Sequence, residues 1–197
     1  MPIKAPIKAA IFDLDGTLTQ PYLNFDVIRR EIGLSVEDGP ILEAMARMSQ
    51  ADRQRAYDVL EKHEETAVDE SKLNPGAKKV LETLRCRGIA VGVLTRNKRE
   101  NALRIAERHG LVFDAVLGRD DGPIKPDASG ILSLCKTFSV DPTQTLMIGD
   151  YVHDLECARA AGAVSVLLMT HINADQFRSY ADFAVENIEQ ILQIVEA

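Results

Sequence analysis

Short apolar runs alternate with helical repeats along most of the chain. Five of the six apolar runs stop at a polar residue or a glycine, as buried strands do; the runs are 9–12, 89–94, 115–117, 145–148, 164–168 and 183–185. Between them, apolar residues recur at helical spacing over 77–87, 98–109, 127–138, 152–161 and 187–196. This alternation predicts an α/β fold, in which a parallel sheet is covered by helices on both faces in a three-layer α/β/α core.

The stretch 20–73 breaks the alternation because it contains no strand pattern. Phe25, Ile28 and Ile32 recur with helical spacing, and a long polar helix is expected over 49–68 with Ser49 as its N-cap. We therefore expect a core domain of residues 1–19 and 74–197, with a small helical cap domain of residues 20–73 inserted after the first strand. An ordered insert of about 50 residues is too structured for a loop, and a lid is its natural role.

Composition narrows the class of protein. Of 197 residues, 46% are hydrophobic and 27% are charged, which is ordinary for a globular protein and excludes disorder. The apolar runs are too short to span a membrane, and the first eight residues lack the apolar segment of a secretory signal. A net charge of −7 does not suit non-specific nucleic-acid binding, whereas a small anionic substrate stays compatible with it.

The three cysteines are Cys86, Cys135 and Cys157, and no two of them form a C-x-x-C pair. Each falls inside an expected helix among apolar neighbours, so we expect reduced, buried thiols in a cytoplasmic protein.

The candidate chemistry lies where the expected strands end, because ligands of parallel sheets bind beyond the carboxyl ends of the strands. Asp13 and Asp15 follow the first strand, and their i, i+2 spacing in an extended segment points both carboxylates to one side. Their mutual repulsion needs a cation or a proton between them. A solvated turn is the alternative interpretation of this pair taken alone.

Three further positions add to this pair. The hydroxyl of Thr95 can donate to a phosphoryl oxygen, and the ammonium of Lys125 can neutralise phosphate and carboxylate charge. Asp150 and Asp154 are one helical turn apart and can reach a common magnesium ion. Taken singly, these residues also fit a helix cap, a surface lysine and a carboxylate that compensates a helix dipole.

In their order and placement, these motifs resemble the haloacid dehalogenase superfamily of hydrolases, which are mostly magnesium-dependent phosphatases. The segment Asp13-Leu-Asp-Gly-Thr-Leu18 resembles the first family motif, Thr95 the second, Lys125-Pro126 the third, and Gly149-Asp150 with Asp154 the fourth. The helical insert lies where the family carries its small cap. The arrangement is similar to the phosphoglycolate phosphatase-like branch, and the resemblance covers nearly the whole chain.

The resemblance implies a role for each motif. Asp13 would be the nucleophile that forms an aspartyl-phosphate, and Asp15 would protonate the leaving oxygen and then deprotonate the attacking water. Mg²⁺ would be ligated by Asp13, by the backbone carbonyl of Asp15 and by Asp150, with Asp154 close by in a second shell or through water. Thr95 and Lys125 would hold the phosphoryl group. Arg96 and Asn97 are candidates for substrate contact.

Two departures from the family pattern affect the choice of substrate. Thr19 and Gln20 stand where many helical-cap relatives carry an acidic residue and a serine, and the cap is shorter than usual. Arginines of the cap are candidates for a second anionic group of the substrate, although a solvated helix face explains each of them as well; they are Arg29, Arg30, Arg47 and Arg53.

Several functions remain open. The expected activity is hydrolysis of a small phosphorylated metabolite, phosphoglycolate-like or a sugar phosphate, by a monomer or homodimer. A phosphomutase would keep the same core, whereas a dehalogenase would lack the second acid, so Asp15 argues against it. A non-catalytic phosphate-binding or signalling module also uses an aspartyl-phosphate, but receiver domains carry it on a middle strand and have no helical insert.

Overall fold

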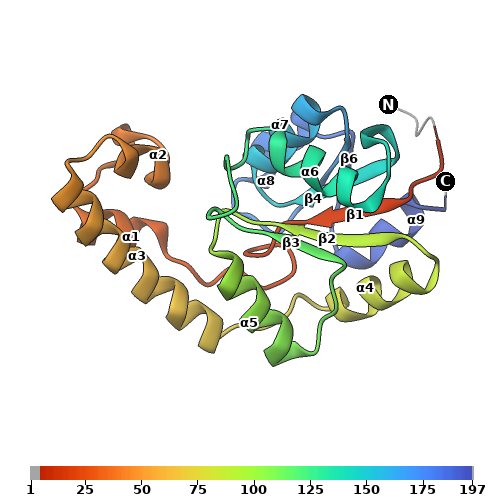
Figure 1. Ribbon diagram of the computed structural model, residues 1–197, viewed down its shortest axis with the longest axis horizontal. Helices are drawn as coiled ribbons and strands as arrows, with labels where there is room; N and C mark the ends of the chain where they lie inside the picture. The colour runs from red at the N-terminus through yellow and green to blue at the C-terminus, as the bar shows by residue number, and fades with distance from the viewer. Residues whose placement is uncertain (1–4, 197) are drawn as a thin grey trace. The chain divides into compact units, whose positions relative to one another are not determined.

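The computed structural model describes residues 5–196, which form two compact units (Figure 1). The first unit ends at Pro21 and resumes at Lys72, and the second is Tyr22–Ser71. Residues 1–4 and residue 197 lie outside the described residues. Over the described range, no helix combines the length and the apolar character that crossing a membrane requires.

Six parallel strands form the sheet of the first unit, which confirms the prediction of a parallel α/β fold. They are β1 Ala9–Phe12, β2 Ala90–Leu94, β3 Ala115–Leu117, β4 Thr145–Gly149, β5 Val164–Leu168 and β6 Phe183–Val185. Their order in the sheet is β3-β2-β1-β4-β5-β6. The chain therefore adds β2 and β3 on one side of β1 and then crosses to place β4, β5 and β6 on the other side. Ligands of open parallel sheets bind at such a reversal of strand order.

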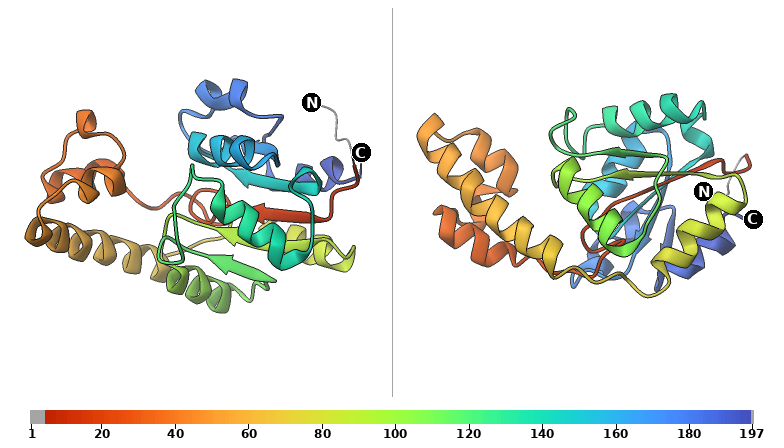
Figure 2. Two further views of the ribbon diagram at one scale, coloured as in Figure 1. Left: turned by 45° about the horizontal axis from the view of Figure 1, so that its top comes forward. Right: turned by 60° about the horizontal axis from the view of Figure 1, so that its bottom comes forward.

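Helices cover both faces of this sheet (Figures 1 and 2). One face carries α4 Ala77–Cys86, α5 Arg99–His109 and α9 Ile191–Ile194, and the other carries α6 Ser129–Phe138 and α7 Val152–Ala161. The strands are almost entirely buried between these layers: every residue of β1 and β4 is buried. Burial on both faces explains the near-continuous apolar runs in the sequence.

The second unit is a helical bundle with its own small core. Its helices are α1 Phe25–Ile32, α2 Ile41–Ala46 and α3 Gln50–Asp69. Ile28, Met45 and Leu60 pack together in its interior. The side chain of Asn24 accepts from Val27 N to cap α1, and Ser49 accepts from Asp52 N to cap α3.

Three local expectations differ from the structure. Cys86 is exposed rather than buried, because α4 buries the face of Ala77, Val80, Leu81 and Leu84, and Cys86 lies on the opposite side; Cys135 and Cys157 are buried as expected. The expected helix 187–196 is a 3₁₀ turn, Ile188–Gln190, followed by the single turn of α9. Between β5 and β6, the short helix α8 Ala174–Phe177 and the 3₁₀ turn Arg178–Tyr180 have no clear apolar repeat and were not expected.

The second unit leaves and rejoins the first at paired segments of chain. Thr19 forms an antiparallel bridge with Leu73, and Gln20 N donates to Lys72 O at 2.8 Å. Asn74 N donates to Leu18 O at 2.9 Å. The sequence Asn74-Pro75-Gly76 looks like a return hinge, but the structure makes Asn74 a buried anchor.

Candidate active site

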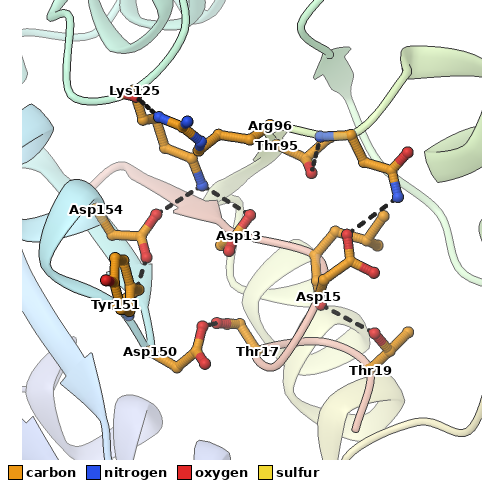
Figure 3. Close-up of polar contacts among 12 residues, drawn as sticks. Asp13, Asp15, Thr17, Thr19, Thr95, Arg96, Lys125, Asp150, Tyr151 and Asp154 are labelled. Carbon is orange, nitrogen blue, oxygen red and sulfur yellow. Dashed lines mark hydrogen bonds and ion pairs between the residues drawn. The ribbon is translucent and has the colours of Figure 1, made fainter. Parts of the chain in front are cut away.

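Three acidic residues of the first and fourth motifs gather at the carboxyl ends of β1 and β4. Phe12 pairs with Ile148, so Asp13 and Asp150 emerge from neighbouring strands. Asp13 N donates to Ile148 O at 2.8 Å and extends the ladder of β1 by one residue. Carboxylate oxygens of Asp13, Asp150 and Asp154 lie within 4.8 Å of one another (Figure 3).

Lys125 lies between two of these carboxylates. Its Nζ is 2.7 Å from Oδ1 of Asp13 and 2.6 Å from Oδ1 of Asp154, and its side chain exposes 2% of its surface (Figure 3). The other carboxylate oxygen of Asp154 accepts from Tyr151 N at 3.2 Å. Asp154 therefore fixes the ammonium group beside Asp13 and is itself held by the start of α7.

Two glycines allow this close packing of charged groups. Gly16 has φ of +85°, and a Cβ built on it would collide with the carboxylate of Asp150. A Cβ on Gly149 would collide with the carboxyl group of Asp154. A glycine at each position is therefore a steric requirement of the acidic cluster.

Asp15 lies outside the acidic cluster and contacts the loop after β2. Asn97 Nδ2 donates to Oδ2 of Asp15 at 3.1 Å, and Asn97 N donates to Oγ1 of Thr95 at 3.0 Å. Because the Thr95 hydroxyl accepts this bond, its own proton can be donated to another oxygen. The structure thus separates the two aspartates of the first motif: Asp13 faces Lys125, and Asp15 faces Asn97.

Burial dominates the protonation of the acidic groups. It raises the pKa of Asp13 to about 6, with Lys125 opposing the shift and Asp154 adding to it. Burial and then the charge of Asp13 raise the pKa of Asp15 to about 6, against the hydrogen bond from Asn97. Burial, Asp13 and Asp154 raise the pKa of Asp150 well above its usual value. Although burial opposes it, the same two carboxylates raise the pKa of Lys125, which stays charged.

The acidic cluster has the composition of a magnesium site. Its donors are carboxylate oxygens, the ligands that a hard divalent cation prefers. The charge of Lys125 balances those of Asp13 and Asp154. The Asp150 carboxylate accepts a hydrogen bond of 3.3 Å from Thr17 Oγ1. A buried carboxylate whose pKa is raised by its acidic neighbours is stabilised in its charged form by a bound cation. The residues present therefore fit Mg²⁺.

The remaining candidate residues are arginines, and each donates hydrogen bonds to backbone carbonyls of its own unit. Arg96 Nη1 donates to the backbone carbonyl of Lys125. The four candidate arginines of the insert each donate to a backbone carbonyl within the second unit, as groups do that hold loops and helix ends together. The acceptors are Ser35 and Gly39 for Arg29, Asp26 for Arg30, Asp38 for Arg47, and Met48 for Arg53.

Three further polar residues lie at the site and were not among the candidates predicted from the sequence. Asn74 Nδ2 lies within hydrogen-bond distance of the carbonyls of Gly16, Thr17 and Thr19, at 3.1, 2.7 and 3.2 Å. Thr170 Oγ1 donates to Gly16 O at 2.7 Å, and Thr17 contacts Asp150. Thr17 lies inside the first motif, whereas Asn74 and Thr170 are distant in sequence and only the fold brings them to this turn.

Comparisons with known proteins show what the chain is similar to. The profile of the haloacid dehalogenase-like hydrolases matches residues 7–162. The chain is 28% identical to a haloacid dehalogenase-like hydrolase domain-containing protein of Arabidopsis thaliana, over 98% of this chain and 85% of that protein. It is 30% identical to a phosphoglycolate phosphatase of Nitrosospira multiformis, over 80% of this chain and 81% of that protein. A solved hydrolase from Pseudomonas syringae has the same fold, with a TM-score of 0.75, 22% identity, and coverage of 96% of this chain and 98% of that one.

The fold and the site thus define an α/β protein with a carboxylate-rich centre at the switch point of a parallel sheet. The chain belongs to the haloacid dehalogenase-like hydrolase family, as its four motifs predicted.

Proposed function

We propose that this hydrolase is a magnesium-dependent phosphatase that acts on a small phosphate monoester, phosphoglycolate-like or a sugar phosphate, through an aspartyl-phosphate. The observation that carries the proposal is the pairing of Asp13 with the buried ammonium of Lys125, 2.7 Å away, beside a second aspartate. Relatives named phosphoglycolate phosphatase support the substrate class.

In the first step, the carboxylate of Asp13 attacks phosphorus while the ester P–O bond breaks. Asp15 gives its proton to the departing oxygen, so the leaving group departs as an alcohol. In the second step, Asp15 takes a proton from water, the water oxygen attacks phosphorus, and the P–O bond to Asp13 breaks. Inorganic phosphate leaves, and both aspartates return to their starting states.

The electrostatics of the site support this division of roles. The raised pKa of Asp15, about 6, allows a proton to be present on it near neutral pH. Lys125 stays charged and stabilises the ionised form of Asp13. Phosphoryl transfer depends mainly on positioning and charge neutralisation, which fixed groups of this kind supply.

Further groups complete the proposed site. Asp13, Asp150 and the backbone carbonyl of Asp15 would hold Mg²⁺, with Asp154 behind them as the partner of Lys125. When bound, the ion neutralises negative charge on the phosphoryl oxygens. Thr95 would donate its hydroxyl to the phosphoryl group, and Arg96 remains a candidate for substrate contact. We do not assign the side chain of Asn97 to substrate, because it contacts Asp15.

The helical unit Tyr22–Ser71 is proposed to act as a cap that excludes water while the leaving group departs. The proposed setting is cytoplasmic, with the protein a monomer or homodimer and a phosphorylated metabolite as its partner.

Phosphate release from a panel of phosphate monoesters tests the proposal. The panel includes phosphoglycolate, sugar phosphates, nucleotides and an aryl phosphate, each assayed with magnesium and with chelator. We expect release that requires magnesium and differs among the esters. Transfer of the phosphoryl group between positions of a sugar, activated by a sugar bisphosphate, would replace the phosphatase with a phosphomutase. Silence on every ester from folded protein would contradict both.

A further inference from the structure

A chain of two buried asparagines leads from α5 to the carboxylate of Asp15. Asn97 and Asn101 expose 4% and 5% of their surfaces. Asn101 Nδ2 donates to Asn97 Oδ1 at 2.8 Å, and Asn97 Nδ2 donates to Asp15 Oδ2 at 3.1 Å. A buried amide costs free energy unless it is hydrogen-bonded. Here the amide group of Asn97 finds one of its partners in Asp15 of the first motif.

The orientation of the Asn97 amide is fixed by its neighbours. Its Oδ1 also accepts from the backbone N–H of Lys98 at 2.7 Å. A backbone N–H can only donate, so the atom that faces it must be the amide oxygen. The Nδ2 group therefore faces Asp15, and a flip of the amide would break the bonds to Lys98 and Asn101 together.

The backbone of Asn97 is held as firmly as its side chain. Its N–H donates to Oγ1 of Thr95 at 3.0 Å, and its carbonyl accepts from Arg119 N at 2.9 Å. All four polar groups of the residue thus have partners inside the protein. Such a residue is poorly suited to bind a substrate that comes and goes, but well suited to hold another side chain in place.

We propose that Asn97, oriented by Asn101, is a positioning residue that holds the carboxyl group of Asp15 in the direction from which it transfers its proton to the leaving oxygen. The Asn97 amide donates a hydrogen bond to Oδ2 of Asp15. The carboxyl group can then rotate little, and Oδ1 is the atom left to carry the proton toward the substrate. The inference rests on the proposed phosphatase function and adds a determinant of its leaving-group dependence.

Comparison of two aryl esters tests this role. The value of kcat/KM reports the steps up to departure of the phenol, so hydrolysis of the phosphoenzyme does not enter it. Phenyl phosphate has a poor leaving group that needs protonation, whereas 4-nitrophenyl phosphate has a good one. In Asn97→Ala we expect kcat/KM to fall roughly 10- to 100-fold for phenyl phosphate and less than about 3-fold for 4-nitrophenyl phosphate.

Asn101→Ala removes one of the two donors that orient the amide, so we expect the same selectivity with a smaller loss. Should Asn97→Ala fail to fold, Asn97→Ser and Asn101→Ala carry the test. Ile105→Val is the matched control: Ile105 is buried on the same face of α5 and makes no polar contact with the site. We expect it to lower the midpoint of thermal unfolding while leaving the ratio of the two kcat/KM values unchanged.

The outcomes separate this inference from the proposed function. Equal losses for both esters, or no loss for either, in the folded Asn97 and Asn101 variants would overturn the positioning role while leaving the phosphatase intact. A folded wild-type protein that releases phosphate in magnesium from neither aryl ester nor any other ester of the panel would overturn both.

Discussion

Lys125 and Asp154 form a buried ion pair, with Nζ 2.6 Å from Oδ1 and each side chain 2% exposed. The same Nζ reaches Asp13, so one ammonium group pairs with a carboxylate that follows β1 and with one in the first turn of α7. Because both side chains are buried, solvent screens this pair little. The pair therefore links the stability of the fold to the proposed nucleophile, Asp13.

Replacing Lys125 removes this link. In Lys125→Met we expect the free energy of unfolding to fall by about 3–5 kcal/mol, because two buried carboxylates lose their partner. Lys79→Met is the control: Lys79 pairs with Glu189 at 3.0 Å on the surface, where an ion pair contributes about 0–1 kcal/mol. Urea denaturation of both variants measures the difference. Similar losses in the two would show that the buried pair contributes little.

Asp13→Asn tests the nucleophile directly. The amide cannot form the acyl phosphate, so we expect phosphatase turnover to fall by at least about 10⁴-fold. The fold should persist, since Lys125 keeps Asp154 as a partner. Steady-state phosphate release and circular dichroism check the two halves of this prediction. A variant with the wild-type rate would remove Asp13 from its assigned role.

Gly16→Ala tests the steric requirement at the first motif. A methyl group there collides with the Asp150 carboxylate, so we expect activity to be lost along with magnesium affinity. Gly33→Ala supplies the comparison, because Gly33 has φ of +81° and open space around its Cβ position. That variant should lose about 1 kcal/mol of stability from backbone strain and keep its activity. Equal effects on activity would mean that strain, and not the contact with Asp150, explains the glycine.

The stability of the metal-free protein should fall as pH rises from about 4 to about 6. Asp13 and Asp15 have pKa values near 6 in the fold and near 3.8 when unfolded, so the folded state keeps protons that the unfolded chain releases. Stability is then lost with rising pH, by roughly 2–4 kcal/mol over this window. Urea denaturation in chelator at several pH values measures the trend.

Two companion measurements sharpen this test. Saturating magnesium should flatten the pH dependence, since a bound cation favours the ionised carboxylates. Asp150→Asn in chelator should be more stable than the wild type at pH 7, because one of three crowded carboxylates loses its charge. A metal-free wild type that gains stability between pH 4 and pH 6 would contradict the argument.

The sequence predicted the sheet well because its strands are buried on both faces and therefore apolar throughout, as in β1 and β4. It also pointed to the residues that follow those strands, because the carboxyl ends of parallel strands meet at one edge of the sheet. It could not show how the motif residues pair. Asn97 is the example: its position after Thr95 suggested substrate contact, whereas its direction depends on Lys98, Asn101 and Asp15, which only tertiary structure brings together.

Irregular segments were the other failure. Arg178–Tyr180 and α8 are too short for an apolar repeat to develop, so periodicity carries no signal there. Cys86 shows a related limit, since membership of a helix does not say which face a residue occupies. Asn74 was read as part of a hinge from its neighbours Pro75 and Gly76, while its three carbonyl partners lie 55 to 58 positions away.

The bridge between Thr19 and Leu73 means that the chain departs for the helical unit and comes back at a single point. The hydrogen bond from Gln20 to Lys72 closes that point like the base of a hairpin. What lies between these residues can change in length and sequence without rerouting a strand of the sheet. Inserts of other shapes could be grafted at this point, and a short turn could replace the present one, which would separate the evolution of specificity from that of the hydrolytic centre.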